Sequence, residues 1–226
     1  MPSGGTLTFR APLTVPGQMQ PKSQQTLQPR VLYITSRGHS GSTLLSLLVS
    51  GHSQVVSAGE LKMLSNPDPQ RRLCSCHRQV PSECPFWGAV EQHVQSRVGC
   101  SLDQLLLVDG GDDATFMSHN EALFTAIAEV SNSALIVDSS KSLPRLSRLL
   151  SVEAQGAAFT LHPVHLHRGP FGSMNSARKR GDALRQAAYN YVRLFFLTRE
   201  RLRGVRALRV YYERLAADPR SEMARV

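Results

Sequence analysis

The chain has 226 residues, of which 41% are hydrophobic and 19% charged, and its formal net charge is +9 at pH 7. This length suffices for one domain with a sizeable core, and no apolar run reaches the roughly 20 residues of a bilayer-spanning helix. The charge is uneven, since residues 144–226 hold 16 of the 26 Lys and Arg but 6 of the 17 Asp and Glu. A basic half favours an anionic partner, although solvated helix faces would give the same bias.

The first 30 residues are rich in Pro, Gln, Ser and Thr and lack the apolar core of a signal peptide. They predict a flexible leader over residues 1–30, and the remaining residues 31–226 predict one domain. The compartment stays open. The sequence as given is typical of a cytoplasmic protein, and an incomplete N-terminus would make the Golgi lumen the alternative.

Buried strands alternate with helices along the rest of the chain. The predicted strands cover residues 31–35, 55–58, 134–138, 159–167 and 206–212. The predicted helices cover residues 43–48, 114–130, 143–154 and 182–203, with a last one starting at Asp218-Pro219. The apolar stripe of the helix over 182–203 is Leu184, Ala188, Tyr191, Phe195 and Leu202. This alternation predicts an α/β fold, a parallel sheet flanked by helices, with sites at the carboxyl ends of the strands.

An irregular insertion rich in Cys and Pro is predicted over about residues 65–87. Three of the four cysteines, Cys74, Cys76 and Cys84, lie within it, and four in 226 residues do not make a disulfide scaffold. Because paired Cys-x-x-Cys elements are missing, a disulfide or buried thiols are favoured over a metal knuckle. No metal ligands are therefore assigned.

The loop that follows the first predicted strand consists of Arg37, Gly38, His39, Ser40, Gly41, Ser42 and Thr43. Its small residues let backbone N–H groups approach an anion, and the N-terminus of the next helix adds a favourable dipole. Three hydroxyl groups and two basic side chains suit a phosphate or phosphosulfate. An ordinary Gly/Ser turn between strand and helix has a similar composition, so the loop alone is moderately specific.

Two other known motifs, the Walker A phosphate loop and the nucleophile elbow of hydrolases, match this loop only in part. A Walker A loop needs GxxxxGK before Ser or Thr, but Ser36 occupies the first glycine position and Ser42 the lysine position. A nucleophile elbow needs GxSxG, and Ser42 replaces its second glycine. An ATPase or GTPase is therefore disfavoured, and a hydrolase acting through Ser40 remains a weakly supported alternative.

The run from Ser40 to Leu45 resembles the 5′-phosphosulfate loop of the sulfotransferase family, which has a P-loop-like fold. Many members carry Arg or Lys directly before the Ser-Gly pair, where this chain has His39, with Arg37 two residues earlier. Arg168 at a strand end, with Ser176 eight residues later, resembles the family's 3′-phosphate site, although Gly169 and Phe171 depart from its pattern. The resemblance implies 3′-phosphoadenosine 5′-phosphosulfate (PAPS) as co-substrate and no metal.

Weaker matches extend the resemblance from about residue 31 to the C-terminus. Glu60 stands where some members place the catalytic base, and Lys141 where a lysine touches the leaving group. Residues 211–219 resemble a late family segment, and residues 74–87 resemble a Cys-x-Cys…Cys-Pro-x-Trp insertion of microbial-type members. Because family chains normally continue further, we expect the domain to be C-terminally incomplete.

The implied reaction transfers a sulfuryl group from PAPS to a hydroxyl or amine. Glu60 is then the general base, Lys141 and His39 act at the leaving group, and residues 37–43 with Arg168 and Ser176 bind the donor. The acceptor stays unidentified among sugars, peptide tyrosines, lipids and small alcohols. The basic C-terminal part mildly favours an acidic one, and neither nucleic acid nor a transmembrane segment is expected. The alternative from another class is a catalytically inactive protein that binds nucleotides or sulfated glycans.

Overall fold

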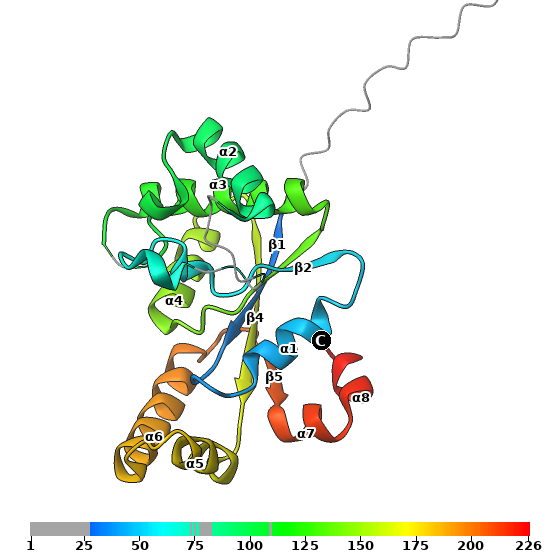
Figure 1. The fold of residues 1–226 in the computed structure, drawn as a ribbon, viewed down its shortest axis with the longest axis vertical. Helices are drawn as coiled ribbons and strands as arrows, with labels where there is room; N and C mark the ends of the chain where they lie inside the picture. Colours follow the sequence, from blue (N-terminus) through cyan, green and yellow to red (C-terminus); the bar gives the residue numbers. More distant parts are fainter. Residues whose placement is uncertain (1–27, 73, 75, 77–82, 109) are drawn as a thin grey trace, which may run out of the picture.

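The computed structural model describes residues 28–72, 74, 76, 83–108 and 110–226, so the predicted leader lies almost wholly outside the described residues. Five parallel strands form one sheet in the order β2-β3-β1-β4-β5 (Figure 1). The strands are β1 (Arg30–Thr35), β2 (Val55–Ser57), β3 (Leu135–Asp138), β4 (Thr160–His167) and β5 (Leu208–Tyr211). The parallel sheet confirms the predicted α/β fold.

Helices connect the strands and cover the sheet. They are α1 (Ser42–Val49), α2 (Pro85–Val98), α3 (Asp113–Ser131), α4 (Leu143–Ala154), α5 (Pro170–Lys179), α6 (Leu184–Arg201), α7 (Tyr212–Ala217) and α8 (Pro219–Met223). Short 3-10 helices are η1 (Leu61–Met63), η2 (Pro69–Arg71) and η3 (Leu102–Gln104). The start of α2 shortens the irregular stretch predicted to reach residue 87. Pro85 suits the first turn of a helix, and Trp87, Val90 and Val94 form its buried face.

Alternate residues of the central strand face two separate cores. Val31 and Tyr33 are fully buried against the core formed with α2, α3 and α4. Leu32 and Ile34 lie in the core formed with α1 and α7. Because successive side chains of a strand point to opposite faces, an almost continuously apolar strand requires cover on both sides. Figure 1 shows this arrangement, with α1, α7 and α8 on one face and α2, α3 and α4 on the other.

The buried strip of α6 differs from the predicted one. Leu184 and Phe195 of the predicted stripe are 47% and 37% exposed, whereas Ala187 and Thr198 are buried. The reason is the position of α6, which packs against α5 and α4 and lies beyond the carboxyl ends of the strands (Figure 1). Because only α5 and α4 pack against α6 there, only a narrow strip of its surface is buried. Within the described part of the chain, no helix is both long and apolar enough to cross a bilayer.

Candidate functional site

The candidate site lies at the carboxyl end of β1, where the order of the sheet reverses. β1 pairs with β3 on one side and with β4 on the other, and the chain fills the β2-β3 side of the sheet before it crosses to the β4-β5 side. In open parallel sheets, ligands bind in the crevice outside such a switch point. The segments that follow β1, β2, β3 and β4 supply the predicted site residues, from the loop over residues 37–43 to Glu60, Lys141 and Arg168.

The loop after β1 has a backbone that glycine makes possible. Gly41, the N-cap of α1, has φ 93°, and His39 has φ 62°, both in the left-handed region. A Cβ atom at Gly41 would also lie 2.3 Å from the Tyr212 ring. Within the loop, the Ser40 hydroxyl donates to the Arg37 carbonyl at 2.6 Å. The loop is therefore closed on itself just before the N-terminus of α1, and the N-terminus of a helix suits an anion.

Lys141 and Glu60 meet beside the first turn of α1. The Lys141 ammonium forms an ion pair with the Glu60 carboxylate and lies 3.5 Å from Ser42 Oγ. A second ammonium, that of Lys62, lies 3.6 Å from the other oxygen of Glu60. The φ of Lys141 is 60°, and its N–H donates to the carbonyl of Ile34 at 3.2 Å, which draws the segment after β3 toward β1. The structure thus brings together three predicted residues that are far apart in the sequence.

A buried ion pair beneath these residues was not predicted as part of the site. Asp138 and Arg145 are both fully buried, with Arg145 Nε 3.2 Å from Asp138 Oδ2. Asp138 Oδ1 accepts the N–H groups of Ser140 at 2.9 Å and of Leu61 at 3.4 Å. Asp138 therefore joins the segment after β2 to the segment after β3, and so positions Glu60 and Lys141. An arginine on the otherwise apolar face of α4 was the sequence signal that could have found it.

Arg168 is held against the loop from the end of β4. Its Nη1 donates to the carbonyl of His39 at 3.0 Å, and its guanidinium lies 4.3 Å from the centre of the Tyr212 ring. The next residue, Gly169, donates its N–H to the Glu213 carboxylate at 2.9 Å. Tyr212 and Glu213 at the start of α7 therefore support the position of Arg168, which explains why residues 211–213 belong with the site.

Ser176 does not join Arg168 in this structure. Its Oγ accepts a hydrogen bond from Arg180 Nη1 at 2.8 Å, near the end of α5. Arg37 lies on the same side of the loop, with its guanidinium 5.9 Å from the centre of the Tyr191 ring. Burial, and then the positive charge of Arg180, lowers the pKa of Arg37. Arg180, which was not predicted, also forms an ion pair with Asp182 at 2.5 Å, so Arg37, Arg180 and Ser176 lie beside one carboxylate.

Unpartnered polar atoms gather at this end of the sheet. Among the described residues, Thr35 Oγ1, Ser36 Oγ and Arg168 Nε are buried and have no hydrogen-bond partner. Buried polar groups without partners are uncommon in proteins, and a ligand or water supplies the missing bond in many cases. A polar ligand at the carboxyl ends of β1 and β4 fits these atoms.

His39 and Ser40, the two loop residues to which the sequence assigns a chemical role, have different surroundings. The side chain of His39 is exposed, while its carbonyl is held by Arg168. Ser40 is 3% exposed, and its hydroxyl donates to a backbone carbonyl. A serine nucleophile needs a hydrogen bond to a general base, and Ser40 makes none within the described residues. This geometry does not favour the hydrolase alternative.

Three hollows adjoin the site. A cavity of about 30 Å³, the size of a bound water, lies under the loop between Ser40, Arg168 and Tyr191. A hollow of about 590 Å³ lies between β4, β5 and α6, next to His167, Arg199 and Tyr211. Another of about 540 Å³ adjoins Lys62, Arg71 and Leu106. The two larger ones have the volume of small-molecule sites, and the last borders the partner of Glu60.

Comparison with known proteins relates the fold to solved sulfotransferase structures. No family model matches the sequence, and no curated protein matches it. The sulfotransferase domain from the Synechococcus PCC 7002 olefin synthase is similar in structure, with a TM-score of 0.50 and 20% identity over 92% of this chain and 74% of that chain. Sulfotransferase STF9 from Mycobacterium avium gives a TM-score of 0.46 and 16% identity over 87% of this chain and 62% of that chain. The first likeness shows a sulfotransferase-like fold.

Proposed function

We propose that this chain is a sulfotransferase that moves a sulfuryl group from PAPS to a hydroxyl or amine of an acceptor. The observation that carries the proposal is the meeting of Lys141, Glu60 and Ser42 at the N-terminus of α1. An ammonium group, a carboxylate and a phosphate-type loop are the three parts that such a transfer needs. They suit in-line displacement at an anionic centre, which depends on positioning and charge rather than on covalent chemistry.

The donor would occupy the outer side of the loop. Its 5′-phosphosulfate would accept N–H groups at the start of α1, with Ser42, Thr43 and Arg37 around it. Its 3′-phosphate would lie between Arg168 and the Ser176–Arg180 pair. Arg168 Nε, buried without a partner, supports a negatively charged ligand on this side.

In the proposed reaction the acceptor oxygen forms a bond to sulfur while the bond between sulfur and the bridging phosphate oxygen breaks. Glu60 takes the acceptor proton, and Lys141 stabilises the negative charge that develops on the departing phosphate. Before donor binding, Glu60 and Lys141 neutralise each other. The donor's oxygens give Lys141 new acceptors, which leaves the Glu60 carboxylate able to accept a proton.

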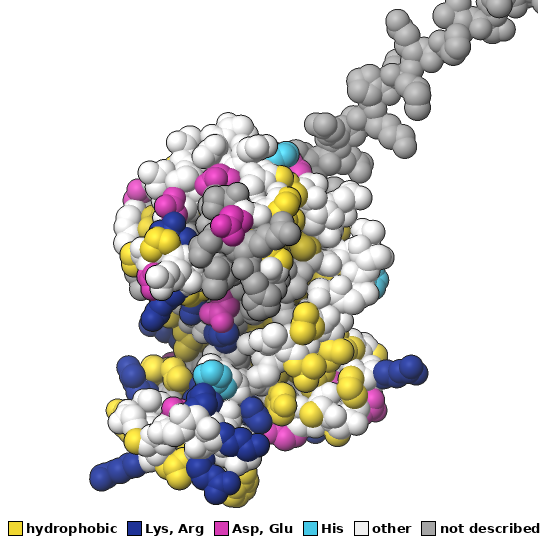
Figure 2. All heavy atoms as spheres, viewed as in Figure 1, with side chains coloured by type: hydrophobic (Ala, Val, Ile, Leu, Met, Phe, Trp, Pro, Cys, Tyr) yellow, Lys and Arg dark blue, Asp and Glu magenta, His cyan; other side chains and the backbone are white. Residues whose placement is uncertain are grey.

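The acceptor would approach through the hollow beside Lys62, because its hydroxyl must reach Glu60. Lys62, Arg71 and Asp103 line this hollow. Figure 2 shows Lys and Arg side chains gathered at the end of the molecule that carries α5 and α6. These charges support an acidic acceptor.

The test is Lys141→Ala, compared with Arg220→Ala, which removes one positive charge from the exposed surface of α8. We expect the protein to bind 3′-phosphoadenosine 5′-phosphate by calorimetry and to transfer radiolabelled sulfate from PAPS within a broad acceptor panel. Lys141→Ala should lose transfer, while Arg220→Ala should retain it. Donor binding without transfer to any acceptor would instead favour the inactive nucleotide-binding alternative, and absence of both would overturn the proposal.

A further inference from the structure

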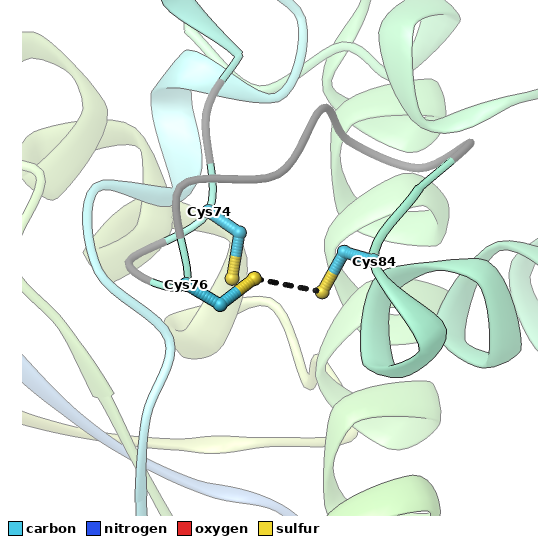
Figure 3. A group of neighbouring side chains, drawn as sticks. All are labelled: Cys74, Cys76 and Cys84. Carbon is cyan, nitrogen blue, oxygen red and sulfur yellow. Dashed lines mark hydrogen bonds between the residues drawn. The ribbon is translucent and has the colours of Figure 1, made fainter.

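Three cysteine side chains come together at the edge of the irregular segment before α2. The Sγ atoms of Cys74, Cys76 and Cys84 all lie within 4.8 Å of one another, and the distance from Cys76 to Cys84 is 3.7 Å. Figure 3 shows the three side chains pointing toward a common centre, two from the segment after η2 and one from the residue before α2. We propose that this cluster binds a zinc ion through three thiolates.

The spacing of the sulfur atoms fits a tetrahedral ion. A Zn–S bond of about 2.3 Å places two sulfurs of a tetrahedron about 3.8 Å apart. The Cys76–Cys84 separation matches this edge, and the third sulfur lies within reach of the same centre. Soft thiolate ligands select zinc over magnesium, calcium and manganese, which prefer oxygen.

A disulfide uses only two of these sulfurs. Its bond length of about 2.05 Å would draw Cys76 and Cys84 together and leave Cys74 outside the link. The convergence of all three thiols is the feature that the metal explains and the disulfide does not. The sequence favoured a disulfide or buried thiols because it showed no paired Cys-x-x-Cys element, whereas the fold joins a Cys-x-Cys pair to a distant third cysteine.

The described residues next to the cluster are the exposed helix η2 on one side and the buried start of α2 on the other. No residue of η2 is buried, so its apolar contacts with the core are few. Cys84 is 4% exposed and is the N-cap of α2, whose Trp87 is buried in the core. A metal bound between Cys84 and the Cys74–Cys76 pair would anchor this segment to α2, and metal binding contributes directly to the stability of such small units.

Because the three ligands are thiols, zinc binding at this site involves proton release and leaves one coordination position open. Binding converts thiols to thiolates and releases their protons to solvent, so affinity rises with pH. Cys76 is exposed, which gives an entering ion a path from solvent. Three thiolates leave the fourth tetrahedral position to water or to another donor.

The experiment measures zinc in the full chain, purified under reducing conditions, with Cys76→Ser as the test and Cys100→Ser as the matched control. Cys100 lies outside the cluster, 3.9 Å from His119. We expect one zinc per chain by elemental mass spectrometry in the wild type and in Cys100→Ser. Loss of a ligand in Cys76→Ser should weaken zinc binding at least roughly tenfold, the lower range reported for perturbing the groups that merely support a metal's ligands.

Two further measurements keep the inference decidable if Cys76→Ser folds poorly. Cobalt(II) added to the metal-free wild type should give the intense thiolate charge-transfer absorption of sulfur ligands. A chelator should lower the melting temperature of the wild type and of Cys100→Ser. Reduced wild type that binds neither metal, or an isolated protein that carries a Cys76–Cys84 disulfide, would overturn the proposal. Neither result depends on sulfate transfer.

Discussion

Glu60 is the side chain on which the proposed proton transfer depends. Glu60→Gln keeps the size and the hydrogen bonding of the side chain but cannot accept a proton at neutral pH. We expect turnover to fall by about 10² to 10⁴ while donor affinity changes little, because a general base acts on the acceptor. Steady-state kinetics alongside a melting curve gives the comparison. Turnover near that of the wild type would remove Glu60 from the mechanism and make His39 the next candidate.

Arg168 illustrates how one side chain serves both the loop and the proposed ligand. Arg168→Ala should weaken binding of 3′-phosphoadenosine 5′-phosphate by roughly 1.5 to 3 kcal/mol, the range for hydrogen bonds to charged groups. Because Nη1 also holds the His39 carbonyl, part of this loss would come from a looser loop. Arg168→Lys separates the two contributions, since it keeps the charge but loses the fork geometry. An unchanged dissociation constant in folded Arg168→Ala would exclude the role.

The buried His165 on β4 should make the free energy of unfolding depend on pH. Burial, and then the nearby His167 and Arg209, lowers the pKa of His165 from 6.5 to about 4. Between these values the unfolded chain binds a proton that the folded protein does not, so the free energy of unfolding falls as the pH drops from 6.5 to 4. At about 1.36 kcal/mol per pKa unit, the full loss is on the order of 3 kcal/mol.

His165→Gln removes that ionisable group. The melting temperature of the variant should therefore fall less between pH 7 and pH 4.5 than that of the wild type. His52→Gln, which changes an exposed histidine before β2, is the control and should behave as the wild type does. Parallel curves for wild type and His165→Gln would show that the protonation of His165 is not linked to folding.

At the scale of elements, the Asp138–Arg145 pair joins β3 and α4 to the segment after β2. Arg145→Leu leaves the Asp138 carboxylate buried without its counter-ion, so we expect a loss of about 3 to 5 kcal/mol in the free energy of unfolding. The double variant Asp138→Asn with Arg145→Leu removes both charges and should recover part of this loss. Denaturant titrations of the single and double variants measure the coupling. Additive effects would mean that the two side chains do not act as a pair.

At the scale of the whole molecule, the proposed site has one group of residues for a 5′-phosphate and another for a 3′-phosphate. A nucleotide that carries both phosphates should therefore bind better than ATP. We expect 3′-phosphoadenosine 5′-phosphate to raise the melting temperature more than ATP does at equal concentration. The missing Walker lysine disfavours ATP, while Arg168 and the Ser176–Arg180 pair suit a 3′-phosphate. A ligand at about 100 times its dissociation constant adds about 2.7 kcal/mol of stability, enough for a measurable shift. Equal shifts for the two nucleotides would contradict the assignment.

The features predicted correctly from the sequence are those that depend on residues close together along the chain. The strands at 30–35 and 135–138 are short apolar runs and part of β4 alternates, so these patterns and the helix after β1 follow from residues close together along the chain. The small residues of the loop were recognised from the sequence, whereas the left-handed backbone of Gly41 is seen in the structure. The helix α2 was not predicted, and the predicted apolar stripe of α6 was wrong at Leu184 and Phe195, because packing against α3 and α5 decides both.

The tertiary structure decided what depends on residues far apart. Lys141 and Ser42 are separated by 99 positions, and only the order of the sheet brings their side chains together. The same applies to the Asp138 carboxylate that accepts the Leu61 N–H, 77 positions away. Sequence periodicity records which face of an element is buried, but not which elements become neighbours. The sequence by itself thus determined the strands, most of the helices and the loop, whereas burial of both faces of the sheet determined how their ends form a site.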